Sequence, residues 1–139
     1  MKKIIVFLCL CVCAGVSAMA TEQEELPCNG GAIVTAKDGT KFCHSNKEMN
    51  WWSAFAWCES QGRKLADFTT MCGNVSQSPG GTVGQCPNLQ NVVTYCVWSS
   101  LASGSNYAIV VCSDGAVYAG NRATGNGRNT YYVLCDEDK

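Results

Sequence analysis

Residues 49–67 read MNWWSAFAWCESQGRKLAD and carry the pattern that decides the fold. Apolar side chains recur there at i, i+3, i+4 and i+7, which is the spacing of one face of an α-helix. The four residues that share this face are Trp51, Ala54, Phe55 and Cys58. A face made of two aromatic rings, a methyl group and a thiol must be buried, so the stretch predicts a helix over residues 51–61 that packs on the core.

The ends of this helix are marked as well. Asn50 is a suitable N-cap, because its side chain can accept a hydrogen bond from a free backbone N–H of the first turn. Gly62 stands where a residue in the left-handed conformation would end the helix. Residues 65–66, a Leu-Ala pair, then return to the core, and Asp67 can cap a short second helix that reaches Cys72.

The first twenty residues have the composition of a secretory signal peptide, with two lysines, a short apolar run and a small-residue cleavage site ending at Ala20. The apolar run is too short to span a bilayer, so we expect no stable membrane insertion. The expected organisation is a signal peptide at 1–20, an acidic tether at 21–27 and one domain at 28–139.

Cysteine usage indicates an oxidising destination. Removing twenty of the 139 residues leaves 119, and eight of the eleven cysteines remain. No two of these eight are closer than ten positions, which excludes the paired spacing of zinc sites and Cys-x-x-Cys redox motifs. We therefore expect a disulfide framework in a secreted protein, whether periplasmic, on the cell surface or extracellular.

Charge argues against nucleic acid as a partner. Without the two lysines of the signal peptide, eight basic residues face eleven acidic ones, and no basic stripe is present. A protein that binds nucleic acid needs such a positive surface to neutralise phosphates.

Strand patterns occupy much of the remaining chain. An Asp-Gly turn at residues 38–39 predicts a hairpin, and Cys28 and Cys43 would pair across its base. A second hairpin would put Cys112 in the middle of the sheet, where Cys96 on a preceding strand can reach it. Strands are expected near residues 90–98, 106–112, 116–119 and 130–135, with loops at 73–88 and 119–130.

The chain resembles the C-type lectin-like fold at these positions. The first helix of that family carries a Trp, an Ala three residues on, a Cys four further, a Gly four further and then Leu-Ala. All six match here, at Trp51, Ala54, Cys58, Gly62, Leu65 and Ala66. Residues 131–135, YYVLC, are similar to its last strand. The resemblance covers roughly residues 41–135.

A middle segment is more similar to short bacterial members of the superfamily, such as the C-terminal domain of collagen-like bacterial adhesins. The residues that carry this similarity are Trp98, Ser99, Ser100, Ala108, Val110 and Gly115. Together with the Lys-Lys start of the signal peptide, they favour a bacterial source.

The resemblance implies an α+β fold, C-type lectin-like, with one main and one short helix packed on a small, mainly antiparallel sheet. It also implies a bridge between the helix cysteine and the last strand. With this bridge, two cysteines remain to close the loop between them. The full set of expected disulfides is Cys28–Cys43, Cys58–Cys135, Cys72–Cys86 and Cys96–Cys112.

An uncharged segment argues against calcium. From Phe68 to Ser113, forty-six residues, the chain has no Asp, Glu, Lys or Arg. Sugar-binding C-type lectins take their calcium ligands from this region, through a Glu-Pro-Asn or Gln-Pro-Asp triplet and a Trp-Asn-Asp triplet. The equivalents here, at residues 86–88 and 98–100, contain no carboxylate. Calcium needs several oxygen ligands, usually with charged ones among them, so we expect no metal site and no cofactor.

Enzymatic interpretations have little support. The one histidine, His44, follows a strand-end cysteine and is interpreted as a surface residue or a local hydrogen-bond donor. Asp67 and Asp114 flank the uncharged segment and could approach as paired acids, but a helix cap and a hairpin turn explain them more simply. No serine stands in a nucleophile-elbow context. We therefore do not expect an enzyme.

The remaining function class is binding. Trp52 and Trp57 lie off the buried helix face, where packing against the hairpin or sheet is favoured over exposure. The loop before the last strand carries polar side chains that can hydrogen-bond hydroxyl or acidic groups. Those expected to contact a ligand are Asn121, Arg122, Asn126, Arg128 and Asn129.

The sequence thus predicts an adhesin-like recognition module that binds a glycan or an extracellular protein without calcium. The alternative is a structural or assembly subunit of a bacterial surface appendage, with no free ligand.

Overall fold

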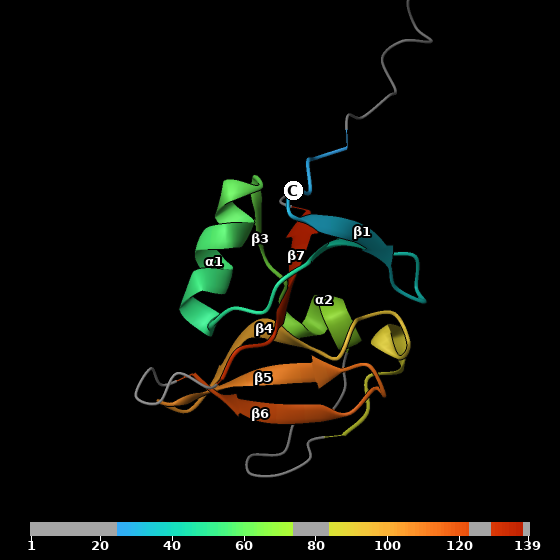
Figure 1. Cartoon of the computed structure of the whole chain (residues 1–139). Helices are drawn as coiled ribbons and strands as arrows, with labels where there is room; N and C mark the ends of the chain where they lie inside the picture. Colours follow the sequence, from blue (N-terminus) through green and yellow to red (C-terminus); the bar gives the residue numbers. More distant parts are fainter. Residues whose placement is uncertain (1–24, 74–83, 123–128, 138–139) are drawn as a thin grey trace, which may run out of the picture.

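The helix predicted within residues 49–67 is present in the computed structural model, which describes residues 25–73, 84–122 and 129–137 (Figure 1). This helix, α1 (Trp51–Ser60), is capped by Asn50, whose Oδ1 accepts a hydrogen bond from Ser53 N at 2.8 Å. Gly62 follows its end with φ +71°. Phe55 is only half-buried, which corrects the prediction, because its ring packs edge-on against Trp51 at the flank of the helix.

The described residues form a small α+β structure with a mainly antiparallel sheet. Besides α1, its elements are β1 (Gly31–Thr35), β2 (Lys41–Ser45), β3 (Arg63–Leu65), α2 (Phe68–Cys72), the 3-10 turn η2 (Pro87–Leu89), β4 (Cys96–Ser103), β5 (Tyr107–Cys112), β6 (Val117–Asn121) and β7 (Tyr132–Glu137). The sheet order is β1-β2-β7-β4-β5-β6. β4 and β7 run parallel, and β3 pairs with the far end of β7 beyond β4.

The sheet is buried on both faces, because side chains of successive residues point to opposite sides. On the α1 face, Trp51 and Cys58 pack with Trp98 and Val110 of the sheet. On the other face, α2 and η2 cover a second cluster that includes Phe42, Met71, Leu89 and Leu134. Central strands therefore contribute alternate residues to the two cores.

Four disulfides tie these elements together, and their pairings are the expected ones. They join Cys28 to Cys43, Cys58 to Cys135, Cys72 to Cys86 and Cys96 to Cys112. The first lies at the base of the β1–β2 hairpin, the second links α1 to β7, and the last joins β4 to β5. Four such bridges indicate an oxidising environment.

One predicted strand begins later than expected. The sequence predicts a strand near 90–98, but β4 starts at Cys96. Asn91 and Tyr95 have positive φ angles of 62° and 53°, which are incompatible with an extended strand. The apolar spacing of the segment comes instead from Leu89 and Val93, which are buried in the second cluster.

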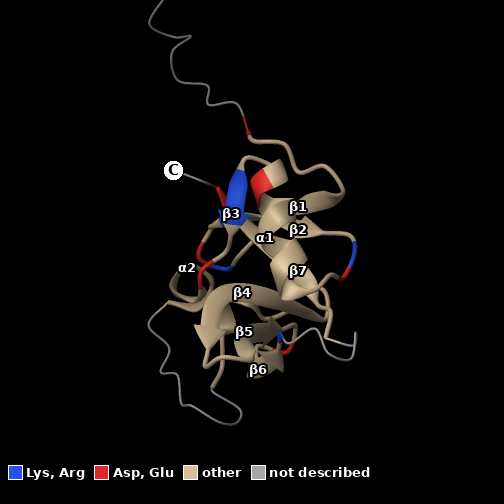
Figure 2. Cartoon of the chain, turned by 90° about the vertical axis from the view of Figure 1, so that its left-hand side faces the viewer, with Lys and Arg blue, Asp and Glu red and all other residues tan. Residues whose placement is uncertain are grey.

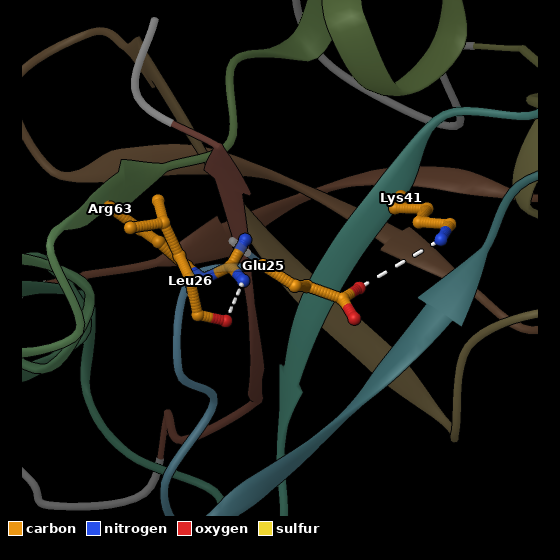
Figure 3. A network of polar contacts seen from close by, with 4 residues as sticks. All are labelled: Glu25, Leu26, Lys41 and Arg63. Carbon is orange, nitrogen blue, oxygen red and sulfur yellow. Dashed lines mark hydrogen bonds and ion pairs between the residues drawn. The ribbon is translucent and has the colours of Figure 1, made fainter. Parts of the chain in front are cut away.

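The end of the predicted tether contacts the domain (Figure 3). The buried Arg63 side chain donates hydrogen bonds to the carbonyl oxygens of Leu26 at 2.7 Å and Pro27 at 3.2 Å. Glu25 Oε1 lies 3.8 Å from Lys41 Nζ. The predicted signal peptide and residues 21–24 lie outside the described residues, as do 74–83 and 123–128 of the predicted loops.

Across the described ranges, no helix has the length and apolar character needed to span a bilayer.

Candidate functional site

The loop predicted to meet a ligand begins and ends beside the start of α1. Arg122 directly follows β6, and its backbone N–H donates to Asn106 O at 2.8 Å. At the other end, Tyr131 and Met49 pair through both backbone N–H···O bonds, at 3.0 and 3.2 Å. Asn121 ends β6 and Asn129 is half-buried, while two further predicted residues, at 126 and 128, lie outside the described part.

Arg122 is held firmly against α1. Its guanidinium carbon lies 4.5 Å from the centre of the Trp51 ring and 5.6 Å from that of Trp52. Its Nη2 donates to the carbonyl oxygens of Gly104 at 3.0 Å and Ser105 at 3.2 Å, in the β4–β5 turn. The Nε atom is buried and has no hydrogen-bond partner among the described residues. Stacking on an aromatic face and carbonyl acceptors together fix the planar guanidinium.

The two adjacent tryptophans have different roles. Trp51 is buried, and its Nε1 donates to Ser99 O on β4 at 2.9 Å. Trp52 packs edge-on against Trp51, with ring centres 4.8 Å apart, yet 55% of its surface is exposed. The interpretation that favoured packing over exposure for Trp52 is therefore wrong, because Trp51 alone fills the space over β4. Trp57 is half-buried.

Strand β6 extends this surface along the edge of the sheet. Tyr118 and Gly120 are two positions apart and therefore both lie on the α1 face of the sheet, where Tyr118 is exposed. Gly120 leaves room for the rings of Trp98 and Tyr131, which would lie 3.0 Å from an added Cβ. We call Trp52, Arg122 and Tyr118 the aromatic–arginine patch. Figure 2 shows that β4, β5 and β6 around it carry almost no charge, whereas Lys, Arg, Asp and Glu gather around β3.

His44 is buried, which corrects its interpretation as a surface residue and confirms the local hydrogen bond. Its Nδ1 lies 2.7 Å from Ser45 O, and its Nε2 accepts from Thr94 N at 3.1 Å. These partners assign the proton to Nδ1 of a neutral ring. Burial lowers the pKa of His44 below its ordinary value, against the hydrogen bond to Ser45, which would raise it.

Two acids do meet in a cleft, but they are not Asp67 and Asp114, which act as the expected helix cap and turn residue. Asp114 accepts a hydrogen bond from Ala116 N in its turn, and Asp67 caps α2. Asp136 lies beside Asp67, whose backbone N–H donates to Asp136 Oδ2 at 3.4 Å, in a cleft of about 650 Å³. The β7 alternation, in which Asp136 shares the face of Leu134, is the signal that could have found it.

The pKa values of these two acids are shifted in opposite directions. Burial raises the pKa of Asp136 to about 6, helped by the nearby Asp67 carboxylate and opposed by a backbone hydrogen bond and by Lys64. Although burial acts in the same direction on Asp67, hydrogen bonds from Thr70 hold the pKa of Asp67 below its ordinary value. Within the described ranges, no three His, Cys, Asp or Glu side chains gather as a metal site would require.

Comparison of the chain with known proteins finds no match, either to a protein-family model or to a curated protein. The resemblance to C-type lectin-like domains therefore stays a prediction.

Proposed function

We propose that this protein is an exported recognition module, of C-type lectin-like fold, that binds a glycan or an extracellular protein without calcium. The observation that carries the proposal is the exposed Trp52 ring beside the fixed guanidinium of Arg122. An exposed aromatic surface next to an oriented hydrogen-bond donor is typical of binding surfaces, where Trp, Tyr and Arg dominate the energetics.

The rigidity of the patch supports this role. Trp52 stands on α1, and α1 is bridged to β7 by the Cys58–Cys135 disulfide. Arg122 is held by two carbonyl oxygens from the β4–β5 turn. Side chains that are already ordered lose less entropy when a ligand binds. Because β4, β5 and β6 bear no Asp or Glu, recognition at this face uses stacking and hydrogen bonds in place of a chelated cation.

The experiment is a binding screen of the mature protein on arrays of glycans and extracellular proteins in the presence of EDTA. Trp52→Ala and Arg122→Ala are each expected to weaken binding tenfold or more, since each removes one half of the stack. Tyr107→Ala is the matched control, because Tyr107 is also exposed but points to the opposite face of β5.

Three results would contradict the proposal: loss of binding in EDTA, equal binding by Trp52→Ala, or no binding to any glycan or protein. Retained binding by Trp52→Ala would assign recognition to another surface. Absence of any ligand, with co-purification of appendage components, would instead favour an assembly subunit.

A further inference from the structure

A second concave site lies on the other face of the sheet, between the β1–β2 hairpin and the segment before β4. Its volume is about 260 Å³. The residues that line it are Ala32, Val34, His44, Ser45, Asn46, Thr94 and Tyr132. None of these carries a formal charge while His44 is neutral, so the site suits an uncharged ligand. Since one water occupies about 30 Å³ in the liquid, a site of about 260 Å³ is equivalent to roughly nine waters. That volume has room for one six-membered ring with its substituents.

Tyr95 stands beside this site in an unusual state. Its side chain is 70% exposed, the most of any large hydrophobic residue in the described part. Its φ angle is +53°, a strained backbone conformation that bulky residues rarely adopt. A strained residue with an exposed aromatic ring needs an explanation other than packing, because the ring is not buried by the fold.

The backbone around Tyr95 is fixed on both sides. The preceding N–H, of Thr94, donates to His44 Nε2, and the carbonyl of Tyr95 accepts from Ser113 N at 2.5 Å. The next residue, Cys96, is bridged to Cys112 on β5. The ring is therefore presented by a rigid segment, as is typical of a pre-organised binding residue.

Tyr95 continues the aromatic wall of the site. Its ring is nearly parallel to that of Tyr132, with 15° between the planes and 6.1 Å between the centres. Tyr132 in turn contacts the His44 ring, whose centre is 5.4 Å away. Besides these aromatic rings, the site contains the polar side chains of Asn46 and Thr94. Within the described residues, the side-chain groups of these two residues make no hydrogen bond.

We propose that this site binds a single uncharged sugar ring, which stacks on Tyr95 and Tyr132 while its hydroxyl groups bond to Asn46 and Thr94. A sugar ring offers an apolar face for the tyrosines and hydroxyl groups that serve as both donors and acceptors. The inference rests on the proposed recognition function and adds a ligand class and a second subsite to it.

The test is NMR titration of the mature protein with three neutral probes at millimolar concentration: methyl α-mannoside, methyl β-galactoside and methyl N-acetyl-β-glucosaminide. At least one probe is expected to shift the ring signals of His44, Tyr95 and Tyr132. Tyr95→Gly removes the ring and relieves the positive φ, so it should fold as well as the parent and bind at least tenfold more weakly. Tyr95→Phe, which keeps the ring, should bind within threefold of the parent.

Tyr107→Ala is the control, since it removes an exposed tyrosine that belongs neither to this site nor to the aromatic–arginine patch. The inference is overturned if no probe shifts these signals or if Tyr95→Gly binds normally. Trp52→Ala separates the two proposals. If Trp52→Ala abolishes binding on the array and Tyr95→Gly does not, the site beside Tyr95 is refuted and the aromatic–arginine patch is not. If Tyr95→Gly abolishes binding and Trp52→Ala does not, the aromatic–arginine patch is refuted and the site beside Tyr95 is not.

Discussion

At the scale of single residues, Asp136 has the most unusual surroundings of the carboxyl groups in the described residues. It is 6% exposed, its Oδ1 has no hydrogen-bond partner among the described residues, and Oδ2 accepts only one long bond. A carboxyl group in this position is more favourable when protonated, which is why its pKa is raised to about 6.

We expect Asp136 to give the protein a pH-dependent stability. Because its folded pKa lies above the unfolded value, its contribution is fully present below pH 4 and is lost as the pH rises through 6. Asp136→Asn, which stays neutral, should raise the free energy of unfolding at pH 7.5 by about 1–2 kcal/mol, allowing for solvent screening in an open cleft. Urea unfolding at several pH values measures this.

Glu137→Gln is the control for this prediction, because it removes the same charge one residue further along β7. An equal gain in both variants would assign the effect to net charge, and a loss of stability in Asp136→Asn would refute the account.

His44 should act in the opposite sense. Its folded pKa lies below 6.5, so its contribution is present above pH 6.5 and is lost as the pH falls through the folded pKa. Protonation of Nε2 removes the acceptor for Thr94 N–H. In an Asp136→Asn background, we expect the free energy of unfolding to decrease on acidification below pH 6.5, and the Thr94 amide to exchange faster with solvent.

His44→Gln supplies the comparison, since an amide does not titrate in this range. The decrease below pH 6.5 should be absent from that variant; a decrease of the same size there would exclude His44 as its source.

Local backbone chemistry explains which single residues could be predicted. Asn50, Gly62 and Asp67 act within one turn of the chain, so their roles as cap, helix end and second cap follow from adjacent sequence. The states of His44 and Asp136 depend on β2 and β7 meeting residues far along the chain. Adjacent sequence does not contain that information.

At the scale of elements, the packing of β6 against its neighbours requires a residue without a side chain at position 120. A Cβ on Gly120 would lie 2.6 Å from Val110 Cγ2 and 3.0 Å from the rings of Trp98 and Tyr131. Gly120→Ala should therefore lower the free energy of unfolding by about 1–3 kcal/mol through overpacking. Thermal or urea unfolding would measure this loss.

Gly104→Ala is a matched comparison for Gly120→Ala. Gly104 has a positive φ but open space around it, so only backbone strain of about 1 kcal/mol is added. A larger loss for Gly104→Ala than for Gly120→Ala would contradict the packing account.

Periodicity predicted α1, which buries one face, and β5, whose two apolar faces are both buried. It failed at residues 90–95, where buried side chains of a turn imitate a strand. Helical spacing also placed Trp52 off the buried face, but only the position of Trp51 over β4 decides that Trp52 reaches solvent.

At the scale of the whole molecule, the disulfides join segments of very different separation. Cys58–Cys135 spans 77 residues and Cys28–Cys43 spans 15. In the chain-entropy view, the longer closure stabilises the fold by about 4–5 kcal/mol and the shorter by about 3. Replacing both cysteines of the longer bridge with alanine should therefore lower the free energy of unfolding by about 1–2 kcal/mol more than the same change in the shorter bridge.

Chemical unfolding of the two double variants side by side measures this difference. Both cysteines of each pair are replaced, so no free thiol remains to form other bridges. A greater loss from Cys28→Ala/Cys43→Ala would show that strain or packing, and not loop closure, dominates.

The candidate sites were only partly predictable at this scale. The sequence indicated Arg122 as a ligand contact from its place in a polar loop, but not its stack on the tryptophans of α1, a contact between residues about seventy positions apart. The Tyr95 site was missed entirely, because it requires the β1–β2 hairpin, the turn before β4 and β7 to converge. Only the folded sheet order brings them together.

The hydrogen bonds from Arg63 to Leu26 and Pro27 have a consequence for how the domain is displayed. They fix the point at which the preceding chain leaves, beside β3 and the end of β7, while the start of α1 and the end of β6 lie away from it (Figure 1). An attachment made at Glu25 or at Glu137 therefore holds the domain at the same end. A domain immobilised on a surface through either residue would have its aromatic–arginine patch facing away from that surface, so the patch would stay accessible to a ligand in solution.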